Sequence, residues 1–167
     1  MGKNYVYLDL ETTGVKPNRD EIVQIGILDD DNNILMDTLV RPIHNRSWPK
    51  AESIHGISPI DVKDAPALDE LRPQIIEAVK GKDVVIYNSG FDSRFLPDEL
   101  THAASVEDCM EPFAAIYGER NRRYGGFKWQ KLETAARYVS HQWTGQSHRA
   151  IHDCMATRSV WHYILKN

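Results

Sequence analysis

Hydrophobic residues in the first 40 positions fall into short runs that predict three β-strands. The runs span residues 5–10, 21–28 and 34–40, and they are rich in β-branched, aromatic and leucine side chains. Residues 29–33 (DDDNN) separate the second run from the third. Their turn-forming composition, which lacks the Gly and the distal Glu of a calcium-binding loop, predicts a hairpin between these two strands.

Helical spacing and short apolar runs alternate in the middle of the chain. Residues 41–66 contain four prolines and are expected to be irregular. Residues 68–79 repeat apolar positions at helical spacing, and Pro73 is expected to kink or restart that helix. Three further short elements are expected: a buried strand at 84–87, a helix at 92–100 and a strand at 105–110.

The last part of the chain predicts helices. One helical face, expected to pack in the core, carries Trp129, Leu132, Ala136 and Val139. After a polar loop at 140–147, apolar positions from Ile151 to Leu165 predict a final helix. This order of elements predicts an α/β fold, a mixed five-stranded sheet of an antiparallel meander plus parallel strands, flanked by helices. We expect a single domain spanning residues 1–167.

The overall composition, with 41% hydrophobic and 26% charged residues, is typical of a soluble globular protein. No apolar run approaches the roughly 18 residues that a membrane span needs. The chain passes from Met1 almost directly into the first predicted strand, which argues against a signal peptide. Cys109 and Cys154 lie in apolar surroundings and are expected to be reduced core residues. We therefore expect a cytoplasmic protein without membrane contact.

The net charge of −4 is unevenly distributed. Residues 118–149 hold seven Lys or Arg residues against two Glu residues, which gives this segment +5 and the remainder −9. Such a basic stretch is typical of a site that grips phosphates, although a solvated helix face with its loop fits the charges equally well. Tyr124 and Phe127 in this stretch are candidates either for base stacking or for anchoring the loop.

The first candidate for chemistry is the segment 9–14, Asp-Leu-Glu-Thr-Thr-Gly. Strand side chains alternate between faces, so Asp9 and Glu11 are expected to point to the same side. Two adjacent carboxylates repel each other unless a hard divalent cation such as Mg²⁺ or Mn²⁺ binds them. A solvated strand end would carry the same two acids, so this pattern alone leaves both interpretations open.

Two later segments add further candidates. Asp92 follows a buried strand and a small-residue turn, where it is a metal ligand or simply a helix cap. His148 and Asp153 are five residues apart, which is about 140° on a continuous helix. They converge only if His148 precedes the helix and Asp153 lies in its first turns, and His148 would then be a mobile general base. His152 would project about 100° away from Asp153 and is interpreted as a bystander.

Together these segments resemble the DEDDh family, also called DnaQ-like 3′→5′ exonucleases, and most of all its proofreading-subunit and exonuclease X-like members. The resemblance runs nearly from end to end and implies a ribonuclease H-like fold. One position departs, because Lys50 stands five residues before His55, where some relatives carry an acid. The matching motifs are Asp9-x-Glu11-Thr12-Thr13-Gly14, Ile54-His55-Gly56-Ile57-Ser58, Asn88-x-x-Phe91-Asp92 and His148-x₄-Asp153.

The resemblance also implies two-metal hydrolysis of phosphodiester bonds from the 3′ end, releasing nucleoside 5′-monophosphates. Asp9, Glu11 and Asp153 would hold one Mg²⁺ or Mn²⁺ ion. Asp9 would also hold the second ion, which Asp92 would support through water, and His148 would be the general base. The substrate contacts that the resemblance implies are Thr12, Thr13, Ile54, His55, Asn88 and Phe91.

The substrate is less closely defined than the chemistry. A single-stranded or frayed 3′ end of DNA is expected, because the Glu11-Thr12-Thr13 run resembles DNA-active relatives. The alternative is a 3′→5′ exoribonuclease similar to oligoribonuclease or ribonuclease T. A catalytically inactive nucleic-acid-binding module is disfavoured because all five catalytic positions are present. A polymerase or homodimer partner remains open.

Overall fold

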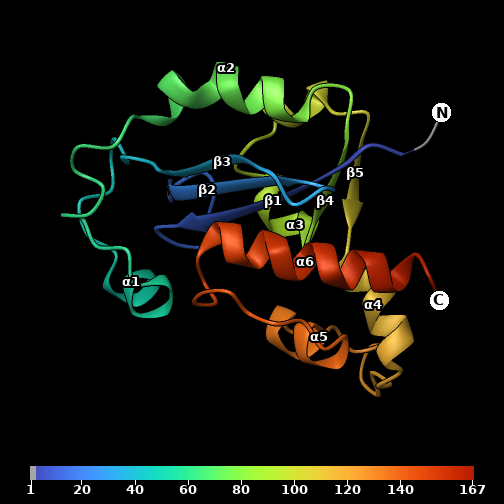
Figure 1. Ribbon diagram of the computed structural model, residues 1–167. Coiled ribbons are helices and arrows are strands. Elements are labelled where there is room, and N and C mark those ends of the chain that lie inside the picture. The colour runs from blue at the N-terminus through green and yellow to red at the C-terminus, as the bar shows by residue number, and fades with distance from the viewer. Residues whose placement is uncertain (1–2) are drawn as a thin grey trace.

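The computed structural model describes residues 3–167, and at its centre lies a five-stranded sheet in the order β3-β2-β1-β4-β5 (Figure 1). The antiparallel meander β1–β2–β3 is extended by β4 and β5, which pair in parallel. The predicted mixed sheet is therefore confirmed. The strands are β1 (Tyr5–Thr12), β2 (Ile22–Asp29), β3 (Ile34–Leu39), β4 (Asp83–Ile86) and β5 (Ser105–Asp108).

Helices cover both faces of the sheet. In Figure 1, α2 lies over one face and α6 over the other, with α4 and α5 outside α6. The helices are α1 (Pro49–His55), α2 (Leu68–Val79), α3 (Ser89–Asp92), α4 (Met110–Tyr117), α5 (Leu132–Tyr138) and α6 (Ala150–Ile164), with a 3₁₀ helix η1 (Glu99–His102). Among residues 3–167, none of these helices has both the length and the apolar character needed to cross a membrane.

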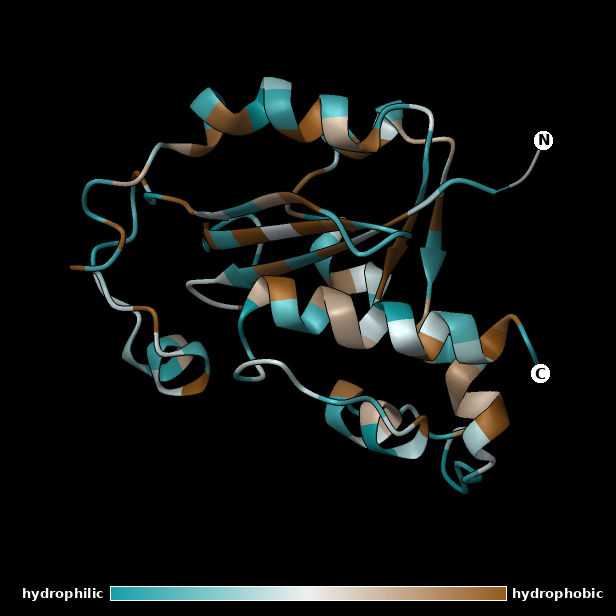
Figure 2. Ribbon diagram, in the orientation of Figure 1, coloured by the Kyte–Doolittle hydropathy of each residue, from teal (hydrophilic) through white to brown (hydrophobic). Residues whose placement is uncertain are grey.

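Alternate residues of β1 enter two different cores. Val6, Leu8 and Leu10 pack with α2, whose buried residues lie on the side toward the sheet (Figure 2). Tyr7 packs instead in the core that contains α6. Fully burying an aliphatic side chain stabilises a fold by about 1.5–3 kcal/mol, so the two cores together fix the position of β1. The two cysteines are free and buried, as predicted.

Helix α1 contradicts the prediction that residues 41–66 are irregular. The helix begins with Pro49, whose fixed φ suits a first helical position. It ends at Gly56, which has a left-handed φ of 70° and whose N–H bonds back into the last turn. Both residues are ordinary helix boundary signals, and the number of prolines in the segment masked them.

Three other boundaries also differ from the prediction. The helix expected at 92–100 does not form, because α3 ends at Asp92 and Pro97 disfavours helical backbone before it. The strand expected at 105–110 stops at Asp108. Met110, the last residue of the expected strand, begins α4 instead. Helix α2 is not restarted at Pro73 and continues to Val79.

Candidate active site

Five acidic side chains line one cleft of about 720 Å³: the four predicted acids, which come from three separate segments, and Glu133 of α5. Asp9 and Glu11 lie at the end of β1, on the sheet face that α6 covers. Asp92 ends the short helix α3, and Asp153 lies in the first turn of α6. His148, in the loop that precedes α6, lines the same cleft. The structure therefore brings together all five residues for which a catalytic role was predicted.

A glycine opposite Asp9 allows α6 to approach the sheet. Gly26 on β2 pairs with Asp9, and a β-carbon on it would lie 2.7 Å from the carbonyl carbon of Ala150. The neighbouring Gln24 accepts a hydrogen bond from the Ala150 N–H through its Oε1 atom, at 3.2 Å. These contacts fix the start of α6, and with it Asp153, over the acids of β1. The sequence analysis did not identify either residue.

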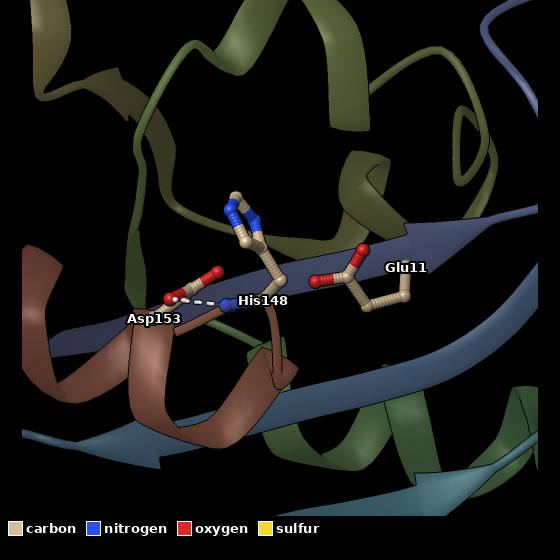
Figure 3. Close-up of side chains that lie close together, drawn as sticks. All are labelled: Glu11, His148 and Asp153. Atoms are coloured by element: carbon tan, nitrogen blue, oxygen red, sulfur yellow. Dashed lines mark hydrogen bonds between the residues drawn. The ribbon is translucent and has the colours of Figure 1, made fainter. Parts of the chain in front are cut away.

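The backbone of His148 turns sharply into α6. Its φ of 60° lies in the left-handed region, which non-glycine residues rarely adopt. The His148 N–H donates to Asp153 Oδ1 at 3.3 Å, and the ring Nε2 lies 3.0 Å from Glu133 Oε1 of α5. One ring nitrogen of His148 and one carboxylate oxygen each from Glu11 and Asp153 all lie within 4.8 Å of one another (Figure 3). Residues five apart thus converge because His148 precedes the helix, as the sequence analysis required.

Burial and mutual repulsion make the acids hard to ionise on their own. Burial, followed by the charges of its neighbours, raises the pKa of Asp9 well above its usual value. The same two causes raise the pKa of Glu11 to about 8. Burial is also the main reason why the pKa of Asp92 rises to about 8 and that of Asp153 to about 6. Clustered carboxylates of this kind are stabilised in the charged form by a nearby cation.

The donor set of the cleft fits hard divalent cations. Carboxylate oxygens are the ligands that Mg²⁺ and Mn²⁺ prefer, and five acidic side chains line this one cavity. The cluster of Glu11, His148 and Asp153 also includes an imidazole nitrogen, which a softer ion could use. The residues present are therefore compatible with a divalent metal centre.

The predicted substrate residues fall into two groups, and the first is exposed to the cleft. Ile54 is 57% exposed and lines the cleft, as do Asn88 and Phe91. Asn88 adopts a left-handed φ of 66° directly after β4, which starts the turn that leads to Asp92. These three side chains can reach a bound nucleotide, and their roles stay predictions.

The second group is buried beneath the cleft. His55 accepts a hydrogen bond from the Ile57 N–H at Nδ1 (3.0 Å), so its Nε2 carries the proton and donates to the carbonyl of Thr12 at 3.1 Å. The Thr12 hydroxyl donates to a nearby backbone carbonyl, and that of Thr13 donates to Asn45. In the described structure, these side chains tie the end of β1 to its surroundings.

Trp129 contradicts the prediction that it packs in the core. Helix α5 begins at Leu132, so Trp129 precedes the helix instead of lying on its buried face. The side chain is 62% exposed and lines the acidic cleft. Helical spacing could not show where the helix starts, and the backbone is extended at Lys131, between Trp129 and the helix.

Comparisons with known proteins find relatives that match most of this chain. The family described as Exonuclease (RNase_T) matches residues 6–160. The chain is 31% identical over 165 residues to a DNA polymerase III PolC-type of Caldanaerobacter subterraneus subsp. tengcongensis, covering 94% of this chain and 11% of that protein. It is 29% identical over 167 residues to "Uncharacterized exonuclease CP81" of Escherichia phage 186, covering 93% of this chain and 84% of that protein.

A solved structure has a similar fold. Exonuclease X in complex with 5′ overhanging duplex DNA matches with a TM-score of 0.73 and 24% identity, covering 97% of this chain and 91% of that chain. The chain thus spans about the whole of this protein but only about a tenth of the PolC-type polymerase.

Proposed function

The chain belongs to the RNase_T exonuclease family and is DnaQ-like, and we propose that it is a metal-dependent enzyme that removes nucleotides from single-stranded or frayed 3′ ends of DNA. The observation that carries the proposal is the convergence of Asp9, Glu11, Asp92, Asp153 and His148 on one cleft. Gathering four carboxylates in one cleft is unfavourable without a compensating cation, and a divalent metal centre explains why they lie together there.

Each acid has a distinct place in the proposed metal centre. Asp9, Glu11 and Asp153 would hold one Mg²⁺ or Mn²⁺ ion, and Asp9 and Asp92 would hold a second. When bound, such a pair of cations offsets the negative charge that develops on the attacking and leaving oxygens of a phosphodiester. The raised pKa values of Asp9 and Glu11 fit this role, because a cation would stabilise their charged forms.

His148 is the general base in the proposed reaction. Its ring takes a proton from a water molecule as the water oxygen attacks the phosphorus of the last phosphodiester. The bond between phosphorus and the 3′ oxygen of the penultimate nucleotide then breaks, the leaving oxygen takes up a proton from water, and His148 releases its proton to solvent. The products are a nucleoside 5′-monophosphate and a chain that ends one nucleotide earlier in a 3′ hydroxyl.

DNA is the proposed substrate on the basis of the relatives. The PolC-type relative is named as a DNA polymerase, and the structure of Exonuclease X contains duplex DNA with a 5′ overhang. An RNA substrate is the competing outcome, and a single assay decides between them.

The assay uses the purified chain with 5′-labelled and 3′-labelled single strands of DNA and RNA that have the same sequence. With Mg²⁺, the 5′-labelled DNA is expected to shorten one nucleotide at a time, and the 3′-labelled DNA to release labelled mononucleotide at once. Excess EDTA is expected to stop both. Undiminished cleavage in EDTA would refute the metal mechanism, and release of nucleotides from the 5′ end would refute the direction. Faster cleavage of RNA would correct the substrate class.

A further inference from the structure

The segment between α4 and α5 forms a β-hairpin, residues 119–128, and residues 129–133 directly after it line the acidic cleft. Arg120 and Phe127 form an antiparallel bridge, and the Lys128 N–H donates to the Glu119 carbonyl at 2.8 Å. At the base, Glu119 also accepts a bond from Lys128 Nζ at 2.9 Å. Because this ion pair involves the hairpin's one acid, the basic residues of its tip are left without an opposing carboxylate within the hairpin.

The tip of the hairpin has a defined turn. Asn121 Oδ1 accepts hydrogen bonds from the N–H groups of Arg123 and Tyr124, each at 3.1 Å. Gly125 and Gly126 follow with left-handed φ values of 76° and 68°, which glycine adopts without strain. The turn therefore holds the side chain of Tyr124 out from the body of the protein, and that side chain is 78% exposed.

Gln130 joins the hairpin to the catalytic end of the sheet. The buried Tyr87 hydroxyl, just after β4, donates to the Gln130 carbonyl at 2.9 Å. Gln130 Nε2 donates to Glu119 Oε2 at 3.0 Å, across the base of the hairpin. Since Tyr87 directly precedes Asn88, the hairpin is tied to the strand end that leads into the active site.

Trp129 connects the acidic cleft to the outer surface of the hairpin. It lines the cleft and also a second hollow of about 540 Å³, which it shares with Tyr124 and Phe127. Tyr124 in turn borders a third hollow, of about 670 Å³, that is lined by the hairpin's basic residues. Exposed aromatic and basic side chains thus follow one another continuously from the metal-binding acids outward.

The charges of this path complement a nucleic-acid strand. The guanidinium of Arg120 lies over the Phe127 ring at 4.6 Å from its centre, and that of Arg123 lies over the Tyr124 ring at 5.1 Å. Arg122 and Lys128 also border the third hollow. A positively charged groove combined with aromatic rings is the usual design of a site for unpaired nucleic acid, because the rings stack on bases that have no partner.

We propose that Trp129 and the hairpin form a track for the single-stranded segment that lies upstream of the scissile bond. Trp129 stacks on a base at the mouth of the cleft, Tyr124 stacks on a base further out, and Arg122 and Arg123 contact the phosphates between them. This inference rests on the proposed exonuclease function and specifies how that function selects long, unpaired strands over short ones.

The test compares a long substrate with one too short to reach the track. The long substrate is a 12-nucleotide thymidine oligomer, and the short one is the p-nitrophenyl ester of thymidine 5′-monophosphate. The ratio of kcat/KM on the oligomer to kcat/KM on the ester is expected to fall about tenfold in Trp129→Ala and in Tyr124→Ala, since each lost stacking contact weakens binding by about that factor. Trp129→Phe is expected to retain most of the ratio, because a stacking ring remains.

Two exposed residues provide matched controls. Arg137 lies in the same basic segment but on α5, outside the hairpin, and Leu165 lies at the far end of α6 from Asp153. Arg137→Ala and Leu165→Ala are expected to leave the ratio near the wild-type value. If these controls lower the ratio as much as Trp129→Ala does, the proposed track is wrong.

Binding without turnover separates this proposal from the proposed function. The dissociation constant of a fluorescein-labelled 12-mer is measured by anisotropy in an Asp9→Asn background, with and without the track substitutions. Weaker binding by about tenfold supports the track even if the wild-type enzyme cleaves neither substrate, an outcome that would refute only the exonuclease proposal. Unchanged binding together with an unchanged ratio overturns the track. Equal losses on oligomer and ester would place Trp129 in the terminal nucleotide site instead.

Discussion

On the face covered by α2, β1 presents Val6, Leu8 and Leu10, and every one of these side chains is buried among aliphatic neighbours. On the face covered by α6, the same strand presents Tyr7 in a core and then Asp9 and Glu11 in a cleft. Because side chains alternate between the two faces of a strand, neighbouring residues of β1 lie in two different environments. One face holds the sheet in place, and the end of the other face carries acids with a proposed catalytic role.

Leu8 and Asp9, which are neighbours on β1, allow the most direct test of this comparison. Asp9→Asn is expected to lower kcat by about a thousandfold while the protein stays folded, because the proposed ligand shared by two cations would supply several kcal/mol of transition-state stabilisation. Leu8→Ala is expected to destabilise the fold by about 2–5 kcal/mol, with kcat largely retained in the folded fraction. Activity assays and urea unfolding of both variants measure this contrast. If Leu8→Ala loses as much kcat as Asp9→Asn while folded, the two faces are not separate in function.

His148 and Asp153 test which residues of the cleft bind metal and which transfer protons. His148→Gln is expected to lower kcat by about a hundredfold or more with little change in Mn²⁺ affinity, as for a general base. Asp153→Asn is expected to weaken Mn²⁺ binding as well. Single-turnover kinetics and metal titration of each variant distinguish these outcomes. A large loss of metal affinity in His148→Gln would make His148 a ligand, which its closeness to Glu11 and Asp153 would allow.

Gly26 tests whether the approach of α6 to β2 positions Asp153. A β-carbon at this residue would lie 2.7 Å from backbone atoms of α6, so Gly26→Ala is expected to destabilise the fold by about 1–3 kcal/mol. The shift of α6 is also expected to lower kcat and Mn²⁺ affinity together. The matched control is Gly90→Ala, at a glycine whose added β-carbon would meet nothing within 4 Å. Wild-type metal affinity in a destabilised Gly26→Ala variant would show that α6 does not need this close contact.

The acids of the cleft predict how metal binding stabilises the protein at different pH values. Because the pKa values of Glu11 and Asp92 rise to about 8 on folding, the metal-free native state binds more protons than the unfolded chain. Its free energy of unfolding should therefore fall as pH rises from about 4 toward 8. Mg²⁺ binds the charged acids, so the increase in Tm on adding Mg²⁺ should be larger at pH 8 than at pH 5.5. An equal increase in Tm at both pH values would contradict this linkage. Asp9→Asn serves as the control, in which Mg²⁺ is expected to raise the Tm less.

The fold could be predicted largely from the sequence, because strand and helix periods are local properties. The meander and the final helix were predicted correctly, whereas α1 was missed because its boundary residues, Pro49 and Gly56, lie in a proline-rich segment. The predicted helix at 92–100 failed for a local reason too, since Pro97 limits the backbone before it. Errors of this kind concern boundaries, where capping and proline effects compete with the apolar pattern.

The sequence predicted only those site residues that belong to a recognisable motif. Strand alternation predicted that Asp9 and Glu11 share a face, and helix geometry required His148 to precede the last helix, whereas the family resemblance supplied their expected roles. Gly26 could not be found in this way, because its importance depends on which helix packs over it. Trp129 was assigned to the wrong environment, because helical spacing continues formally beyond the true start of α5.

The most direct test of the account is the number of divalent cations that the cleft holds. Isothermal titration of Mn²⁺ into the wild-type protein, with saturating thymidine 5′-monophosphate as the product, is expected to give two bound ions per chain. Asp9→Asn is expected to give at most one, with weaker affinity, because Asp9 is the proposed shared ligand. If the wild-type protein binds no Mn²⁺ saturably, or if Asp9→Asn binds two ions with the wild-type affinity, the proposed metal centre is wrong.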